Sequence, residues 1–202
     1  MCIRDSYYGM IAQLDHHIGR VLDALAARGL AEDTLVLFTG DHGDFMGDHQ
    51  MMLKAPIHYE ALIRVPLIVH GPGFGVGESV DDPVGTIDIA PTVFDACGLP
   101  MPTHLQGRSL RARGREWALT EDDMLRGSFA FRTLTTGRYR LTRDQVVLER
   151  SELYDLADDP GELTNRWDDP ALRAVRGDLL ALLDDVMRHD LGRELPQVCQ
   201  AG

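Results

Sequence analysis

The segment Thr34–Asp44, with the sequence TLVLFTGDHGD, constrains the fold more than any other part of this chain. Its first six residues are apolar or threonine without polar alternation, which is typical of a strand buried on both faces of a parallel sheet. Ligands of such sheets gather beyond the carboxyl ends of the strands, so we expect Asp41 and His42 at an accessible rim. Gly40 and Gly43 flank this pair and allow the backbone to turn sharply.

The remaining pattern predicts an α/β layer followed by a smaller antiparallel part. Apolar residues at three- and four-residue steps predict a helix over 8–28 that ends at Gly29. A second buried strand is expected at 65–69, and a short helix at 88–98 has Asp88 as its N-cap. Residues 101–116 are rich in Pro, Gly and Arg and are expected to form a long connection. Short strands are predicted at 117–120, 128–135, 138–142 and 152–156, and a closing helix at 170–189.

These elements predict two domains. Residues 7–110 would form the α/β core with half of a metal site, and residues 111–195 a C-terminal antiparallel sheet with a packed helix. Residues 1–6 have no periodicity that links them to the helix pattern that follows. We therefore expect an artefactual leader there and a true N terminus that is missing.

Composition narrows the class of partner. The formal net charge is -12 for 202 residues, which argues against nucleic acid and anionic membrane surfaces and favours a small molecule. The three cysteines, Cys2, Cys97 and Cys199, are widely spaced and form no CxxC pair. They indicate neither a disulfide framework nor a zinc knuckle, and they favour a reducing, cytoplasmic compartment over the periplasm. The oligomeric state is not indicated.

Asp41 and His42 are the candidate metal ligands. A carboxylate and a neutral imidazole both bind divalent cations, and neighbouring residues on a loop can turn toward one ion. Since such a cation takes about six donors, further ligands must come from elsewhere in the fold. The alternative is an Asp-Gly turn that carries a solvated histidine. An EF-hand is excluded because Gly43, Phe45, Gly47 and Met52 stand where its oxygen ligands belong.

Lys54 is the candidate anion-binding residue. It lies thirteen residues after Asp41 among Met, Leu, Ala and Pro residues, and a fixed ammonium suits phosphoryl or sulfuryl oxygens. The alternative is a lysine that snorkels from an apolar patch. His49, His58 and Glu60 share this region, and we expect His49 and Glu60 as possible supports behind the metal ligands. No serine or cysteine has a recognisable nucleophile setting, so no catalytic nucleophile is assigned.

Several motifs in order resemble the sulfatase family of the alkaline phosphatase superfamily. The chain resembles it in the DHG pair at Asp41–Gly43, in Lys54, in Glu60 ahead of RVPLI, and in the GPG turn at Gly71–Gly73. The segments DIAPTVFDACGLPMPTHLQGRSL and ELYDLADDPGELTNR are similar to the family's DIAPT helix, its QGRSL loop and its C-terminal ELYDL-DP-E-N signature. The resemblance covers residues 7 to about 190.

The resemblance implies part of an alkaline-phosphatase-like mixed sheet flanked by helices, with a small C-terminal antiparallel sheet and a packed helix. It implies hydrolysis of a small-molecule sulfate ester by a longer parent enzyme, of which this chain would be an inactive fragment. The divalent metal would be Ca²⁺, with Mn²⁺ or Mg²⁺ as alternatives, and Lys54 would contact the sulfate.

A formylglycine made in a C/S-x-P-x-R motif would be the nucleophile. This motif is absent here, because Arg4 and Ser6 stand where Pro and Arg would follow Cys2. Two other functions stay open: a phosphonate monoester or phosphodiester hydrolase of the same superfamily, and a non-catalytic binding module derived from a sulfatase.

Overall fold

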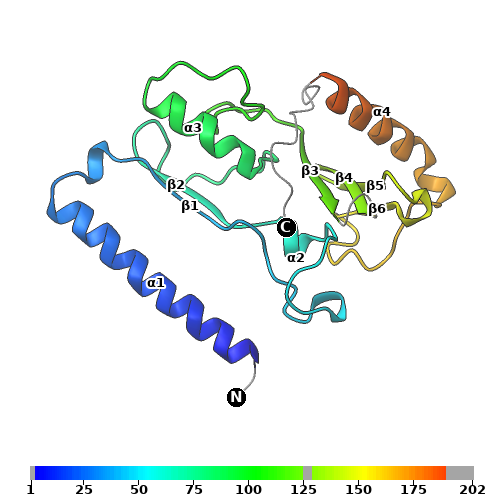
Figure 1. The fold of residues 1–202 in the computed structure, drawn as a ribbon, viewed down its shortest axis with the longest axis horizontal. Helices are drawn as coiled ribbons and strands as arrows, with labels where there is room; N and C mark the ends of the chain where they lie inside the picture. Colours follow the sequence, from blue (N-terminus) through cyan, green and yellow to red (C-terminus); the bar gives the residue numbers. More distant parts are fainter. Residues whose placement is uncertain (1–2, 125–128, 190–202) are drawn as a thin grey trace. The chain divides into compact units, whose positions relative to one another are not determined.

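The computed structural model, drawn in Figure 1, describes residues 3–124 and 129–189. The chain divides into two compact units. Unit 1 comprises residues 1–55 and 61–79, and unit 2 comprises residues 56–60 and 80–202. Within the described ranges, no helix is long and apolar enough to cross a membrane. The mixed α/β fold class predicted from the sequence is confirmed.

Unit 1 is built around a two-stranded sheet. Helix α1 (Ile3–Ala27) leads through a short 3-10 turn into β1 (Val36–Thr39), which pairs with β2 (Leu67–His70). The pairing is antiparallel, with Val36 opposite His70, so the parallel neighbour expected from the sequence is not found between these two strands. No residue of β1 or β2 is buried, and Ile68 and His70 are exposed, so the burial on both faces that the sequence predicted for these strands is not found within the described residues. An unbroken apolar run also does not report the direction of the partner strand.

Helix α1 begins five residues earlier than the predicted start at residue 8. Residues 3–6 of the predicted leader are thus helical, and residues 1 and 2 lie outside the described part of the chain. No residue of α1 is buried. Its predicted apolar stripe, including Ile11, Leu14, Val21 and Leu22, is exposed at the surface of the described chain.

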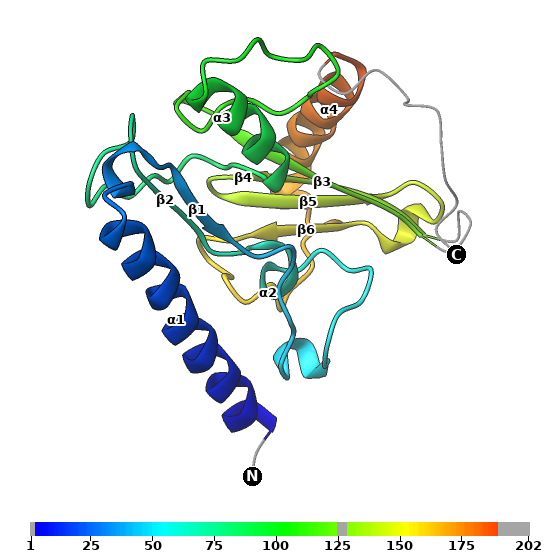
Figure 2. The ribbon, with the colours of Figure 1, turned by 60° about the vertical axis from the view of Figure 1, so that its left-hand side comes forward.

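Unit 2 contains a four-stranded antiparallel sheet in the order β3-β4-β5-β6. Its strands are β3 (Trp117–Met124), β4 (Phe129–Thr136), β5 (Tyr139–Asp144) and β6 (Glu152–Asp155). Helix α4 (Arg173–His189) covers one face of this sheet (Figure 2). The sheet and helix predicted for this region are confirmed, although residue 128 of the second predicted strand and residues 190–195 of the predicted domain lie outside the described ranges.

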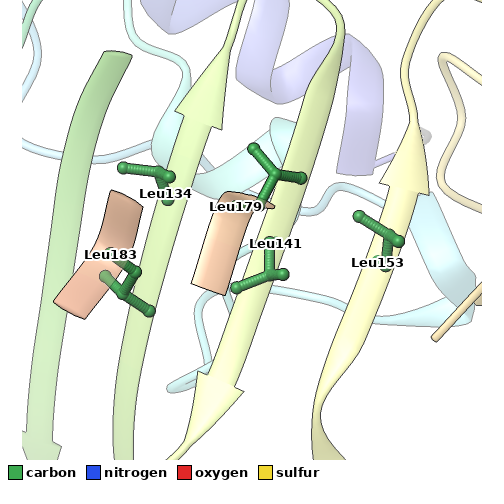
Figure 3. Packing of buried hydrophobic residues seen from close by; sticks show 5 residues of the cluster. All are labelled: Leu134, Leu141, Leu153, Leu179 and Leu183. Carbon is green, nitrogen blue, oxygen red and sulfur yellow. The ribbon is translucent and has the colours of Figure 1, made fainter. Parts of the chain in front are cut away.

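The apolar core of unit 2 lies between the sheet and α4. Leucines that occupy neighbouring register positions on three strands meet two leucines of the helix (Figure 3). These core residues are Leu134, Leu141, Leu153, Leu179 and Leu183, and four of them are fully buried. The period of two along the strands and the three- to four-residue step along the helix direct these leucines to one interface.

Helix α3 (Ile89–Ala96) also belongs to unit 2, and Asp88 stands at its N-cap position as predicted, but the Asp88 side chain makes no capping hydrogen bond to α3. The Asp88 carboxylate is fully buried and pairs with the Arg115 guanidinium at 2.6 and 2.8 Å. It also accepts a hydrogen bond from the backbone of Arg108. These contacts connect α3 to the residues that lead into β3. The compact unit therefore begins at residue 80, whereas the sequence predicted a boundary after residue 110.

Candidate functional site

The candidate metal ligands follow directly after β1 in unit 1. The Asp41 side chain is 90% exposed and the His42 side chain 40% exposed. The backbone N–H of His42 donates to Asp41 Oδ1 at 2.9 Å. This hydrogen bond is the main reason why the pKa of Asp41 lies below its ordinary value, so the carboxylate is ionised at neutral pH.

The hydrogen bonds of His42 define which ring nitrogen carries its proton. Nδ1 lies 2.7 Å from the carbonyl oxygen of Gly43, and only a protonated Nδ1 can donate to a carbonyl. Nε2 lies 3.1 Å from Lys54 Nζ, which has only donors to offer, so Nε2 presents its lone pair. A neutral imidazole with Nδ1–H bound to a backbone carbonyl is the usual state of a metal-ligating histidine.

A compact loop returns the chain from His42 to Lys54. Phe45 is buried, and its backbone N–H donates to the carbonyl oxygen of Leu53 at 3.0 Å. Gly47 donates to Met51 at 2.8 Å inside the same loop. Four non-glycine residues of this loop have positive φ angles: Met46, His49, Gln50 and Leu53. Such conformations cost about 1–3 kcal/mol each and concentrate at functional sites.

Gly43 fixes the start of this loop against the segment at the end of α2 (Glu60–Ile63). Its backbone N–H donates to the carbonyl oxygen of Leu62 at 2.7 Å. A Cβ at this position would lie 1.9 Å from the carbonyl oxygen of Ala61, so only glycine fits. The glycine predicted as a flexible turn residue is therefore required by a close backbone approach.

The spacing of Asp41 and His42 fits two ligands of one cation. Asp41 Oδ2 and His42 Nε2 are 3.7 Å apart. Donors at about 2.1–2.6 Å from a common ion lie about 3–4 Å apart when they meet it near a right angle. Across residues 3–124 and 129–189, no three His, Cys, Asp or Glu side chains form a group that could hold a metal ion. Asp41 and His42 are thus two candidate ligands that lie close together, and any further ligands would have to come from elsewhere.

Glu60 and His49 were expected to support the ligands. The Glu60 carboxylate instead accepts a hydrogen bond from Arg140 at 2.5 Å in unit 2. His49 lies half-buried on the turn at 48–50, where its backbone N–H donates to Asp48. The sequence contains no local signal that Arg140 would be the partner of Glu60. The glutamate of the C-terminal signature, Glu162, could have been singled out from its place in that motif.

Comparisons with known proteins identify the relatives of this chain. Residues 3–99 match the family model for sulfatases. Arylsulfatase K of Rattus norvegicus is 33% identical over 178 residues, which cover 81% of this chain and 31% of the relative. The chain thus spans about a third of the length of the curated relatives it matches.

Two solved structures show the same fold. A 2-O GAG sulfatase is 28% identical with a TM-score of 0.78, and the match covers 88% of this chain and 41% of that one. The phosphonate monoester hydrolase of Agrobacterium radiobacter is 33% identical with a TM-score of 0.81, over 91% of this chain and 41% of that one. Both likenesses extend through unit 1 and unit 2.

Proposed function

Because the chain belongs to the sulfatase family, we propose that it carries one part of the active site of a sulfuric ester hydrolase. In this proposal Asp41 and His42 bind a divalent cation, and Lys54 binds the sulfuryl oxygens of a small-molecule sulfate ester. The catalytic nucleophile would be a formylglycine, whose C/S-x-P-x-R motif does not occur in these 202 residues.

The observation that carries the proposal is the 3.1 Å contact between Lys54 Nζ and His42 Nε2. It brings the Lys54 ammonium to the imidazole of His42, which lies twelve residues earlier in the sequence. A sulfate ester carries negative charge that moves toward the leaving oxygen during hydrolysis. A preorganised cation at this place stabilises that charge without reorganisation at the moment of reaction.

We propose Ca²⁺ as the metal, because the ligands of this half-site include a hard carboxylate and because several further donors are required. When bound, the cation polarises the oxygens of the sulfuryl group. Asp41 holds it through an ionised carboxylate whose pKa is lowered by the His42 backbone N–H. His42 would hold it through the Nε2 lone pair that accepts from Lys54 Nζ in this structure, so that Lys54 would turn from the ring to the sulfuryl oxygens when the cation binds. The hydrogen bond from Nδ1–H to the Gly43 carbonyl would orient the ring.

A phosphonate monoester or phosphodiester is the second candidate substrate. The phosphonate monoester hydrolase of Agrobacterium radiobacter is as similar in sequence to this chain as the rat arylsulfatase K is. The same metal and lysine serve a phosphoryl group, since both groups spread negative charge over several oxygens.

Turnover tests the choice of substrate. The longest reading frame that contains these 202 residues is assayed on 4-nitrophenyl sulfate and on matched phosphate and phosphonate monoesters. We expect the sulfate ester to give the highest kcat/KM, and a preference for a phosphorus ester would overturn the proposal. A reading frame without C/S-x-P-x-R and without turnover would favour a non-catalytic binding module.

Metal binding tests the ligands without turnover. Calorimetry of this chain with CaCl₂ should show weaker binding for Asp41→Asn than for the unmodified sequence, because the amide lacks the charge of the carboxylate. Asp44→Asn is the matched control in the same loop, since the Asp44 carboxylate accepts a hydrogen bond from the backbone N–H of Met46 and is not a proposed ligand. Lys54→Ala should retain the cation. Equal Ca²⁺ affinity for Asp41→Asn and the unmodified chain would refute the assignment.

A further inference from the structure

The five residues Pro56–Glu60 connect Lys54 to the segment that bonds Gly43, and they belong to the other compact unit. Lys54 precedes them, and Ala61 and Leu62, which receive Gly43, follow them; all of these belong to unit 1. The five residues themselves belong to unit 2. We call residues 56–60 the strap, because the chain enters unit 2 and leaves it again within this segment.

The strap lies on the face of the unit 2 sheet that is opposite to α4. That face combines buried polar residues with the buried ring of Phe131, which packs against His58. Thr133 and Thr142 are register partners with hydroxyl oxygens 2.8 Å apart, and both are buried. His58 is 6% exposed, and its Nδ1 lies 2.7 Å from the Thr133 hydroxyl. Tyr59 donates to Glu152 at 3.2 Å.

Arg140 forms ion pairs with Glu60, the last residue of the strap, and with Glu162. Arg140 is 3% exposed, and its two terminal nitrogens bond Glu60 at 2.5 Å and Glu162 at 2.6 Å. The second carboxylate oxygen of Glu162 accepts the backbone N–H of Glu60 at 2.6 Å. Glu162 is 2% exposed and has a φ of 52°, which is a rare conformation for a side chain of this size.

We infer that Thr133, Arg140 and Glu162 are positioning residues for Lys54 and for the loop that starts at Asp41. Three consecutive strap side chains, those of His58, Tyr59 and Glu60, form hydrogen bonds to the sheet, so the residues at either end of the strap have little freedom to move. Lys54 lies two residues before the strap, and the Leu62 carbonyl that receives Gly43 lies two residues after it. The effect of these residues on turnover rests on the proposed function. Their effect on the mobility of the loop does not.

Amide hydrogen exchange of this chain tests the mechanical consequence. Thr133→Val removes the hydroxyl that faces His58 while it keeps the side-chain shape. We expect the Gly43 amide, bonded to Leu62, to exchange at least tenfold faster in this variant. Ser151→Ala is the matched control, because it removes another buried hydroxyl of unit 2, one that accepts from the Asp144 backbone. Equal Gly43 exchange in both variants would overturn the inference.

A milder variant covers the case in which Thr133→Val does not fold. Tyr59→Phe removes only the hydroxyl that donates to Glu152, on a half-buried side chain of the strap. Its expected effect is a several-fold faster exchange of the Gly43 amide. Asp155→Asn is its control, since Asp155 pairs with Arg138 and not with the strap. Unchanged Gly43 exchange in Tyr59→Phe would contradict the inference as well.

A double-mutant cycle tests the catalytic consequence in the longest reading frame. Thr133→Val should lower kcat on 4-nitrophenyl sulfate about tenfold with little change in KM, since small misplacements of a transition-state contact affect the chemical step. In a Lys54→Ala background the same substitution should have no further effect. A full tenfold loss in both backgrounds would overturn the inference. Absence of turnover in the unmodified protein would refute the proposed function alone, because the exchange experiment still decides the role of the strap.

Discussion

The loop Asp41–Lys54 and the strap at 56–60 are neighbours in the sequence, but they are held in opposite ways. The loop presents exposed Asp41, His42 and Lys54 side chains on a backbone fixed by its own hydrogen bonds. None of the strap residues is exposed, and the strap is held by side-chain contacts to Thr133 and Arg140. Substitutions of the exposed loop side chains should therefore change function at little cost in stability, whereas substitutions at the strap should lower stability before they change function.

The largest effect is expected where the strap is fastened. Arg140→Met leaves the buried Glu162 carboxylate without its ion-pair partner, and breaking such a pair from one side costs about 3–5 kcal/mol. Urea denaturation of this chain should show a loss of that size. Arg143→Met is the matched control, because Arg143 pairs with the half-exposed Asp184 and such pairs contribute about 0–1 kcal/mol. Similar losses in both variants would remove the contrast.

On the loop side, Lys54→Ala should affect turnover and leave folding unchanged. Loss of one preorganised cation or donor costs about 3 kcal/mol of transition-state stabilisation, which corresponds to a roughly 100-fold lower kcat/KM. The side chain is exposed, so the free energy of unfolding should change by no more than about 0.5 kcal/mol. The measurements are steady-state kinetics of the longest reading frame and urea denaturation of this chain. A large stability loss with unchanged kinetics would reverse the assignment.

A pH titration separates the two regions by a different route. Burial, together with the positive charges of Arg140 and Arg132, lowers the pKa of His58 to about 4 from an ordinary 6.5. The folded state thus favours neutral His58, and its contribution is fully present above pH 6.5. It is lost as the pH falls from about 6.5 to about 4, at up to 1.4 kcal/mol per pH unit and about 3 kcal/mol in total.

His58→Asn should flatten the stability curve of this chain over that window, measured by urea denaturation at several pH values. His42→Asn is the control, because its ring is exposed on the loop. Asp155 has a pKa lowered by Arg138, so its contribution is lost at still lower pH and does not overlap the main part of the window. A His58→Asn curve that is parallel to that of the unmodified chain would contradict the prediction.

The sequence predicted those parts of the molecule that depend on local pattern or on a motif. The predicted strands and the apolar stripe of the final helix, which was expected to pack with them, form the unit 2 core. Lys54 and His42, which the resemblance assigned to the sulfate and to the metal, lie 3.1 Å apart, and their roles stay predictions. The direction of the β1 partner was not predictable, because burial on both faces occurs for either direction.

The strap was not predictable either. His58 and Glu60 follow Lys54 by four and six residues in the sequence, and for Glu60 this made a role behind the metal ligands the expected one. Their partners Thr133 and Arg140 are 75 and 80 residues away. Buried polar pairs over such separations leave no periodic signal, because each needs only one donor and one acceptor at the right place.

The smallest effect that still separates the two regions is expected at Gly43, the point where the loop rests on the residues after the strap. Gly43→Ala places a methyl group 1.9 Å from the backbone oxygen of Ala61, which cannot move aside as a side-chain end could. We expect a loss of about 1–3 kcal/mol, typical of overpacking, in urea denaturation of this chain. Gly77→Ala does not serve as a control because of its positive φ, whereas Gly85→Ala does, since its nearest atoms are 3.6 Å away. If Gly43→Ala proves as stable as Gly85→Ala, the loop is free to shift away from the strap. In that case the backbone of the loop alone determines the position of Asp41 and His42.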